Sequence, residues 1–289
     1  YQTLRGNTTG RYNVAIGKWA LNGTADANIS IGMNSMYSNT TGGSNVAIGY
    51  ATMFQNTTGV QNVAVGYNTL NANTIGAENV AVGIQAGMYN TTGKRNVAIG
   101  TQALRSNTTG SNNIAIGYLA ALVSTGAVYN VSIGHQALRL NTTGGFNHAI
   151  GTTALYNCTT GQNNVALGTG TLFNNVTGSY NVAIGSTALG ANVTGRNVAI
   201  GDHAMAANTT GLYNTAMGWQ SAYTNSTGTA NVAMGKRALM NNTTAGCNTA
   251  IGIEALCANT TGAASTAVGA CALQANTTGY ENTAVGSLA

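Results

Sequence analysis

A glycine recurs at an almost constant interval along the chain, and this spacing limits how the chain can fold. The glycine closes an Asn-Val-Ala-Ile-Gly run, or a close variant of it, seventeen times between Gly17 and Gly286. Successive glycines lie 17 residues apart, except for one interval of 15 and one of 16. Self-similarity of this kind is typical of solenoids, in which each unit buries its core only by stacking on its neighbours.

Each unit can be numbered by phase, from phase 1 after one glycine to phase 17 at the next. The consensus is x-x-Ala-Leu-x-x-Asn-Thr-Thr-Gly-x-x-Asn-Val-Ala-Ile-Gly, and residues 101–117 are a clean copy. Phases 14 to 16 alternate as a strand does, and 17 residues are too few for two helices and a turn. The sequence therefore predicts an all-β protein, a parallel β-solenoid of about seventeen 17-residue coils.

The domain prediction is a single repeat array over residues 1–289. Because the units at both ends follow the consensus and no capping unit is evident, we expect a segment of a longer fibre protein. The units ending at Gly32 and Gly201 are short, and the missing residues fall near the Asn-Thr-Thr-Gly turn. Length changes confined to one edge predict an exposed loop there.

Within one coil, we expect a strand at phases 13 to 16, a glycine corner, a second short strand at phases 2 to 5 and then the turn. Val14, Ile16 and Leu21, at phases 14, 16 and 4, are expected in the core with their equivalents. The invariant glycine predicts a positive φ or a close approach of stacked backbone. Asn at phase 13, present in 16 of 17 units, predicts a ladder of side-chain amides that satisfies turn backbone groups.

Phase 15 is Ala in fifteen units and Ser in two. If phases 14 and 16 fill the core, phase 15 points outward, where an ordinary surface position would vary. The sequence therefore predicts a self-association stripe along which a second copy packs, formed by Ala98, Ala115, Ala149 and Ala166. The alternative is that a small residue is merely tolerated beside a crowded corner.

Asn-x-Ser/Thr motifs recur at phase 7, on the edge expected to be exposed. In a secretory-pathway host they are candidate glycosylation sites, and the alternative is hydrogen bonding within the turn. The paired threonines that follow also leave open an ice-binding surface. The candidate acceptors are Asn7, Asn39, Asn56, Asn90, Asn107, Asn141, Asn175, Asn192, Asn208, Asn225, Asn242, Asn259 and Asn276.

Composition argues against catalysis, cofactors and nucleic-acid binding. Charged residues make up 5% of the chain, the five acids are scattered, and the ten bases form no run longer than two. The four cysteines and three histidines fall at different phases, which predicts free thiols and no metal site. The segment contains no stretch of 18 apolar residues, so the sequence predicts no membrane-spanning helix in it.

The run Asn-Val-Ala-Ile-Gly-x-x-Ala-Leu, at residues 96–104 and 181–189, resembles the head repeats of the trimeric autotransporter adhesins. Similar repeats occur in phage tail fibres. The resemblance implies a YadA-like, left-handed β-roll that forms a homotrimer or filament outside the cell, on a cell surface or virion. The family unit has 14 or 15 residues, so the Asn-Thr-Thr-Gly turn is an addition here.

These observations together predict an extracellular structural fibre or adhesin head that self-associates, is not an enzyme and binds an unidentified host-surface or matrix ligand. An ice-binding β-solenoid and a phage receptor-binding tail-fibre shaft are the alternatives.

Overall fold

The computed structural model describes residues 2–289 and confirms the all-β parallel β-solenoid. Its regular elements are seventeen strands of three residues, with no helix in the described residues. The chain divides into two compact units, Tyr1–Phe146 and Asn147–Ala289, which are described separately. In each unit one repeat makes one coil, called a rung here.

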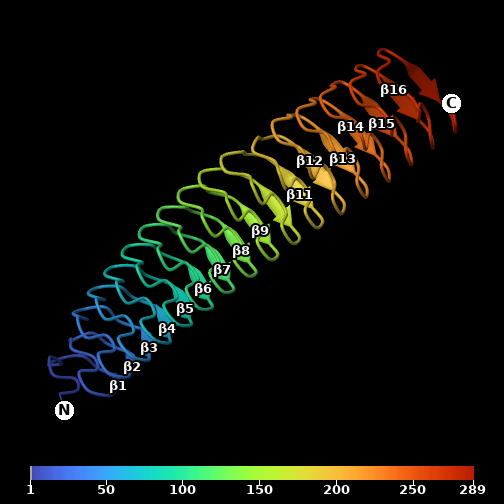
Figure 1. Ribbon diagram of the computed structural model, residues 1–289. Helices are drawn as coiled ribbons and strands as arrows, with labels where there is room; N and C mark the ends of the chain where they lie inside the picture. Colours follow the sequence, from blue (N-terminus) through green and yellow to red (C-terminus); the bar gives the residue numbers. More distant parts are fainter. Residues whose placement is uncertain (1) are drawn as a thin grey trace. The chain divides into compact units, whose positions relative to one another are not determined.

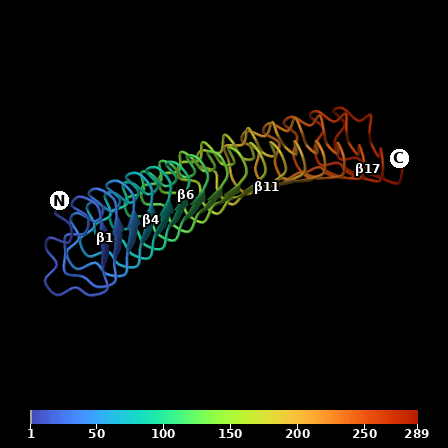
Figure 2. The same ribbon diagram turned by 90° about the horizontal axis from the view of Figure 1, so that it is seen from below.

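The first unit stacks eight strands in sequence order, and each pairs in parallel and in register with the next. Figures 1 and 2 show the rungs of this unit succeeding one another from the blue end of the chain. The strands are β1 (Val14–Ile16), β2 (Ile29–Ile31), β3 (Val46–Ile48), β4 (Val63–Val65), β5 (Val80–Val82), β6 (Val97–Ile99), β7 (Ile114–Ile116) and β8 (Val131–Ile133).

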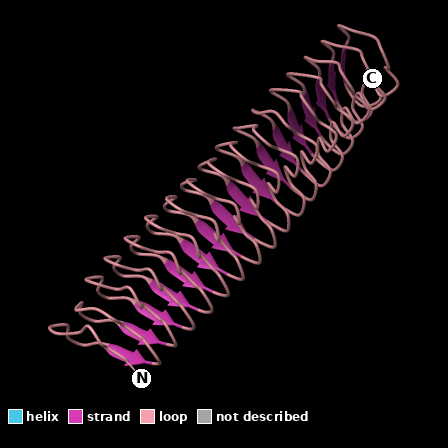
Figure 3. Ribbon diagram, turned by 60° about the vertical axis from the view of Figure 1, so that its left-hand side comes forward, coloured by secondary structure: helices cyan, strands magenta, loops and turns pink. Residues whose placement is uncertain are grey.

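The second unit repeats this arrangement with nine strands, again parallel and in register. Within each unit the strands lie side by side on one face, and loops form the rest of every rung (Figure 3). The strands are β9 (His148–Ile150), β10 (Val165–Leu167), β11 (Val182–Ile184), β12 (Val198–Ile200), β13 (Thr215–Met217), β14 (Val232–Met234), β15 (Thr249–Ile251), β16 (Thr266–Val268) and β17 (Thr283–Val285).

The prediction of a second strand at phases 2 to 5 is wrong. This part of the rung is a series of turns. Gln102 and Leu104, at phases 2 and 4, have φ values of 58° and 49°. Non-glycine residues adopt this left-handed conformation at a cost of roughly 1–2 kcal/mol each. Their N–H groups donate in opposite directions, to Ile84 O of the previous rung at 2.8 Å and to Ala120 O of the next at 3.0 Å. Hydrogen bonding between rungs therefore continues beyond the strands.

The predicted core face of the strand is also wrong. Ala115, the middle residue of β7, is 0% exposed, whereas Ile114 beside it is 37% exposed. Val14 and Ile16 at the first rung are likewise exposed, while Leu21 and Leu104 are buried as predicted. Since a bulky Leu from phase 4 already occupies the interior, only a small side chain fits opposite it. The strand therefore turns Ala inward and its branched residues outward.

Both physical reasons proposed for the invariant glycine hold. Gly100 has a φ of +125°, and a Cβ added there would lie 2.7 Å from the carbonyl oxygen of Gly117, its equivalent in the next rung. Any side chain would therefore strain its own backbone and collide with the backbone stacked on it.

We predict that Gly100→Ala lowers the free energy of unfolding by more than about 2 kcal/mol, because the added methyl meets rigid backbone at a positive φ. Gly126→Ala is the matched control, since Gly126 lies in an exposed turn and its added Cβ would meet only Thr109 Oγ1, at 3.5 Å. Urea unfolding followed by circular dichroism measures both. Equal losses in the two variants would contradict the steric explanation.

Candidate functional site

The alanines expected to form a self-association stripe are inside the solenoid. Ala98, Ala115, Ala149 and Ala166 are all nearly or fully inaccessible to solvent within a single chain. In the first unit, Ala98 and Ala115 belong to a buried cluster that includes Leu104. The prediction of a contact surface at these residues is wrong, because the strand presents its other face to solvent.

That other face of the first unit is a continuous surface of branched aliphatic side chains. We call it the aliphatic face and define it as the first and third residues of β1 to β8. All are Val or Ile, all are exposed or half-buried, and none is charged. Its residues are Val14, Ile16, Ile29, Ile31, Val46, Ile48, Val63, Val65, Val80, Val82, Val97, Ile99, Ile114, Ile116, Val131 and Ile133.

The corresponding face of the second unit is more mixed. It includes His148, Thr215, Thr249, Thr266 and Thr283 beside aliphatic residues such as Ile150, and it contains no Asp, Glu, Lys or Arg. These polar residues were the signal in the sequence that the face is exposed. A narrow apolar core would not accept an unpartnered imidazole or hydroxyl.

The amide ladder predicted at phase 13 is confirmed. In the second unit, the backbone N–H and side-chain Nδ2 of Asn164 both donate to Oδ1 of Asn147, at 3.1 and 3.0 Å. Its Nδ2 also donates to Gly178 O in the following rung, at 2.9 Å. Asn181 repeats the two bonds to Asn164 Oδ1. One buried amide thus joins three successive rungs.

A second amide ladder at phase 7 was not predicted. In the first unit, Asn73 Nδ2 donates to Asn56 Oδ1 of the previous rung at 2.8 Å and to Gly76 O of its own turn at 3.0 Å. Asn90 repeats the same two bonds with Asn73 and Gly93. The side chain therefore closes its turn and stacks that turn on the preceding one.

This second ladder overturns the expectation that the phase-7 asparagines are exposed. Except for the half-buried Asn7 and Asn276 near the two ends, the candidate acceptors are buried. Glycosylation would attach a sugar to Nδ2, the atom that holds the turn closed in this fold. The candidate acceptors that are buried, contrary to the expectation, are Asn39, Asn56, Asn90, Asn107, Asn141, Asn175, Asn192, Asn208, Asn225, Asn242 and Asn259.

We predict that Asn164→Ala lowers the free energy of unfolding by about 3 kcal/mol, since it leaves buried donors of Asn181 without acceptors. Asn174→Ala removes the same side chain from an exposed position where it accepts one bond, from Asn157 Nδ2. That control should cost less than about 1 kcal/mol in the same urea titration. Similar losses of unfolding free energy in the two variants would show that the ladder contributes little to stability.

The two threonines of the turn have different roles. At phase 8 the hydroxyl is bound to the next rung, as where Thr57 Oγ1 donates to Thr74 O and Thr74 Oγ1 donates to Thr91 O, both at 3.0 Å. At phase 9 the side chain is generally exposed, as in Thr58 and Thr109. The phase-9 row is therefore the more accessible of the two to a ligand.

All four cysteines are free thiols, as predicted. Cys158 replaces the phase-7 asparagine of its rung and is fully buried, with its Sγ 3.6 Å from Gly161 O. Burial raises the pKa of this thiol to about 12, because the thiolate would lose its hydration. Within residues 2–289, no three His, Cys, Asp or Glu side chains lie close enough to form a metal site.

We predict that iodoacetamide at about pH 8 alkylates the exposed Cys247 in the folded protein and leaves Cys158 unmodified. Access to Cys158 is closed, and its raised pKa keeps the reactive thiolate scarce. Peptide mass spectrometry measures the modification at each site, and a urea-unfolded sample serves as the control in which both react. Rapid labelling of Cys158 without denaturant would show that this rung opens.

No protein-family model matches the sequence, and a search of curated proteins finds none that is similar. In the described part of the chain, no helix has the length and hydropathy needed to cross a bilayer.

Proposed function

We propose that this chain is a structural module of an extracellular fibre or adhesin head, and that its copies associate through the aliphatic face. One observation carries the proposal, namely that sixteen Val and Ile side chains form an uninterrupted uncharged surface on one unit. The extracellular location rests on the likeness of the repeat to adhesin heads and tail fibres. The proposal assigns no catalytic step to the chain.

The size of the aliphatic face supports association rather than ordinary surface exposure. At roughly 50 Å² of exposed surface each, its sixteen residues present about 800 Å², more than the roughly 300–600 Å² of the largest apolar patch on a typical monomer. A stable protein interface takes about 800 Å² from each partner. The face is thus large enough to be covered by a second copy along its whole length.

The chemistry of the face also favours a copy of the same chain. Val and Ile project at the regular spacing of neighbouring strands, about 4.8 Å, so identical rows can interdigitate when two copies pack together. Because the surface is apolar and uncharged, its partner needs no complementary charge or hydrogen-bonding group. The same surface of a second copy meets this requirement. Closed symmetry would give a dimer or trimer, and an offset arrangement would give a filament.

We predict that Ile99→Lys combined with Ile133→Lys lowers the assembled mass toward the 29.1 kDa of one chain, because each lysine places a charge in an apolar contact. Multi-angle light scattering after size-exclusion chromatography measures the mass, and circular dichroism checks that the rungs persist. Thr109→Lys combined with Thr143→Lys adds the same charge on the exposed turn edge and should leave the assembly intact.

A wild-type chain that is monomeric at all accessible concentrations would overturn the self-association proposal. Association that survives in the Ile99→Lys, Ile133→Lys variant would place the interface on another face. The tail-fibre version of the proposal uses the same interface and differs only in the structure to which the fibre is attached.

Ice binding is a second candidate, and the exposed phase-9 threonines favour it. Rows of hydroxyls at a regular spacing could order water along the turn edge. Thermal hysteresis tests this function directly, and the Thr109→Lys, Thr143→Lys variant should then lose it. Absence of hysteresis in the wild type would remove ice binding and leave the fibre proposal standing.

A further inference from the structure

The two shortened rungs lack the same part of the turn. In the rung ending at Gly32, Thr24 N–H bonds to Thr40 O, as a phase-8 residue does, and Ala25 O accepts from Asn13 Nδ2, as a phase-10 residue does. In the rung ending at Gly201, Val193 N–H bonds to Thr209 O, the phase-8 contact. Thr194 O there accepts the phase-10 bond, from Asn192 Nδ2. Both rungs therefore have one residue, Thr24 or Val193, where the other rungs have the two residues of phases 8 and 9 that form the exposed tip of the turn.

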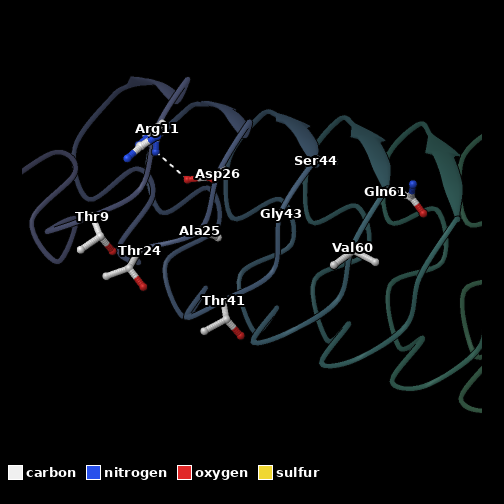
Figure 4. Close-up of a pocket in the computed structure, with 10 residues that line it drawn as sticks. All are labelled: Thr9, Arg11, Thr24, Ala25, Asp26, Thr41, Gly43, Ser44, Val60 and Gln61. Atoms are coloured by element: carbon white, nitrogen blue, oxygen red, sulfur yellow. Dashed lines mark hydrogen bonds between the residues drawn. The ribbon is translucent and has the colours of Figure 1, made fainter.

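Each missing tip coincides with an open groove. The groove in the first unit has a volume of about 760 Å³ and is shown in Figure 4. Thr9, Thr24 and Thr41 lie along its turn side, and Arg11, Asp26, Ser44 and Gln61 also line it. Hydroxyl, amide and charged groups thus surround the groove. At the equivalent position of a full-length rung, the tip of the turn would fill this space.

The groove in the second unit has a volume of about 390 Å³ and lies at the other shortened rung. Arg196 and Tyr180 line it together with Thr177 and Ser179. The Arg196 guanidinium carbon lies 6.0 Å from the ring centroid of Tyr180 and 5.7 Å from that of Tyr213. Its Nη1 also donates to the Tyr213 hydroxyl, at 3.3 Å. Two aromatic rings thus hold the cation at the groove.

Each groove has an arginine whose guanidinium forms no ion pair within residues 2–289. Arg11 bonds to Asp26 Oδ1 only through its backbone N–H, at 2.7 Å. Arg95, by contrast, is paired with Glu78 at 2.9 Å. The hydrogen bond from Arg95 and its positive charge lower the pKa of Glu78, and the same bond and the negative charge of Glu78 raise the pKa of Arg95. No carboxylate of the described residues is paired with the guanidinium of Arg11 or of Arg196, so each can bind an external carboxylate or sulfate.

An exposed tyrosine accompanies each of these arginines. Tyr180 lines the second groove and is 59% exposed, whereas Tyr12, which follows Arg11 directly and is 85% exposed, does not line the first groove. A tyrosine ring offers an apolar face with a hydroxyl at its edge, which suits a ligand that has both apolar and polar faces. Sugar rings have this character, and their hydroxyls can bond to the threonine and serine side chains.

We propose that both grooves bind acidic polysaccharide. Arg11 and Arg196 bind a carboxylate or sulfate of the polysaccharide, and the Ser and Thr side chains of both grooves bond to its hydroxyls. Tyr180 packs on a sugar ring in the second groove. Both grooves are separate from the aliphatic face, since their lining residues lie at phases 8 to 12 rather than 14 and 16. Polysaccharide binding is a function beyond the proposed structural one.

Charge density distinguishes this ligand from nucleic acid. One unpaired arginine per groove matches a polymer with occasional acidic groups among many hydroxyls. Duplex DNA has a charge about every 1.7 Å and is bound by clustered lysines and arginines. The described residues of the grooves contain no such cluster.

The test measures the Kd of the whole chain by fluorescence anisotropy with a labelled heparin oligosaccharide, which has both sulfate and carboxylate groups. An unsulfated oligouronate separates the carboxylate contribution, and dextran is the neutral probe. We expect binding of one or both acidic probes and none of dextran. Arg11→Gln combined with Arg196→Gln should weaken that binding at least tenfold.

A matched control removes two other positive charges, through Lys94→Gln combined with Arg105→Gln, which line neither groove. It should change the Kd less than twofold. A second variant inserts one threonine between Val193 and Thr194 in the Arg11→Gln background, which restores the missing tip and keeps Arg196. It should lose binding while circular dichroism and the thermal midpoint stay unchanged.

Several results would overturn the proposal: no binding of either acidic probe, equal binding of dextran, or equal weakening in the Lys94→Gln, Arg105→Gln control. Duplex DNA that binds more tightly than the oligosaccharides and depends on Arg11 and Arg196 would reassign the grooves to nucleic acid. Because none of these variants alters the aliphatic face, the oligomer mass reports independently on self-association.

Discussion

Hydrogen bonding between buried asparagine amides holds the rungs in register, and the rest of the solenoid depends on it. Each rung has few large apolar side chains, so its apolar burial stabilises it only modestly. An interior amide without a hydrogen-bond partner would cancel much of that stabilisation. The exceptions show how the two ladders tolerate change. Cys158 replaces one phase-7 asparagine, and Asn175 in the next rung still donates to Gly178 O at 2.8 Å. Ser265 replaces one phase-13 asparagine, and its Oγ accepts the backbone N–H of Asn282 at 3.2 Å.

The narrow interior explains why the apolar residues are distributed as they are. Leu at phase 4 and Ala at phases 3 and 15 fill the space that the asparagines leave, and both Ser30 and Ser132 fit where Ala is usual. The larger β-branched residues are consequently outside, where they favour the extended strand conformation. The same constraint that keeps the core small therefore creates the surface proposed for self-association.

Much of the fold was predictable from the sequence, because the repeat fixes the rung and its corner. The 17-residue period, the strand at Ile114 to Ile116, the glycine corner and the phase-13 ladder follow from residue types at fixed phases. The inward face did not follow, since alternation identifies two faces without saying which is inside. A small residue repeated at phase 15 is compatible with a contact surface or with a tight interior, and here the interior is tight. The left-handed turns at phases 2 and 4 had only a weak signal, namely glycine at Gly170 and Gly87.

The ladders also bear on how such a chain changes in length during evolution. Because each rung bonds only to the rungs before and after it, duplicating a whole 17-residue unit copies every donor together with its acceptor. Shortening is tolerated where it spares the phase-13 ladder: Asn28 and Asn197, in the two short rungs, still donate their backbone N–H groups to Oδ1 of Asn13 and of Asn181, at 2.8 and 3.0 Å. Recombination can therefore lengthen the array in whole units. Small deletions in the turn, by contrast, change the surface of a single rung and leave its neighbours as they were.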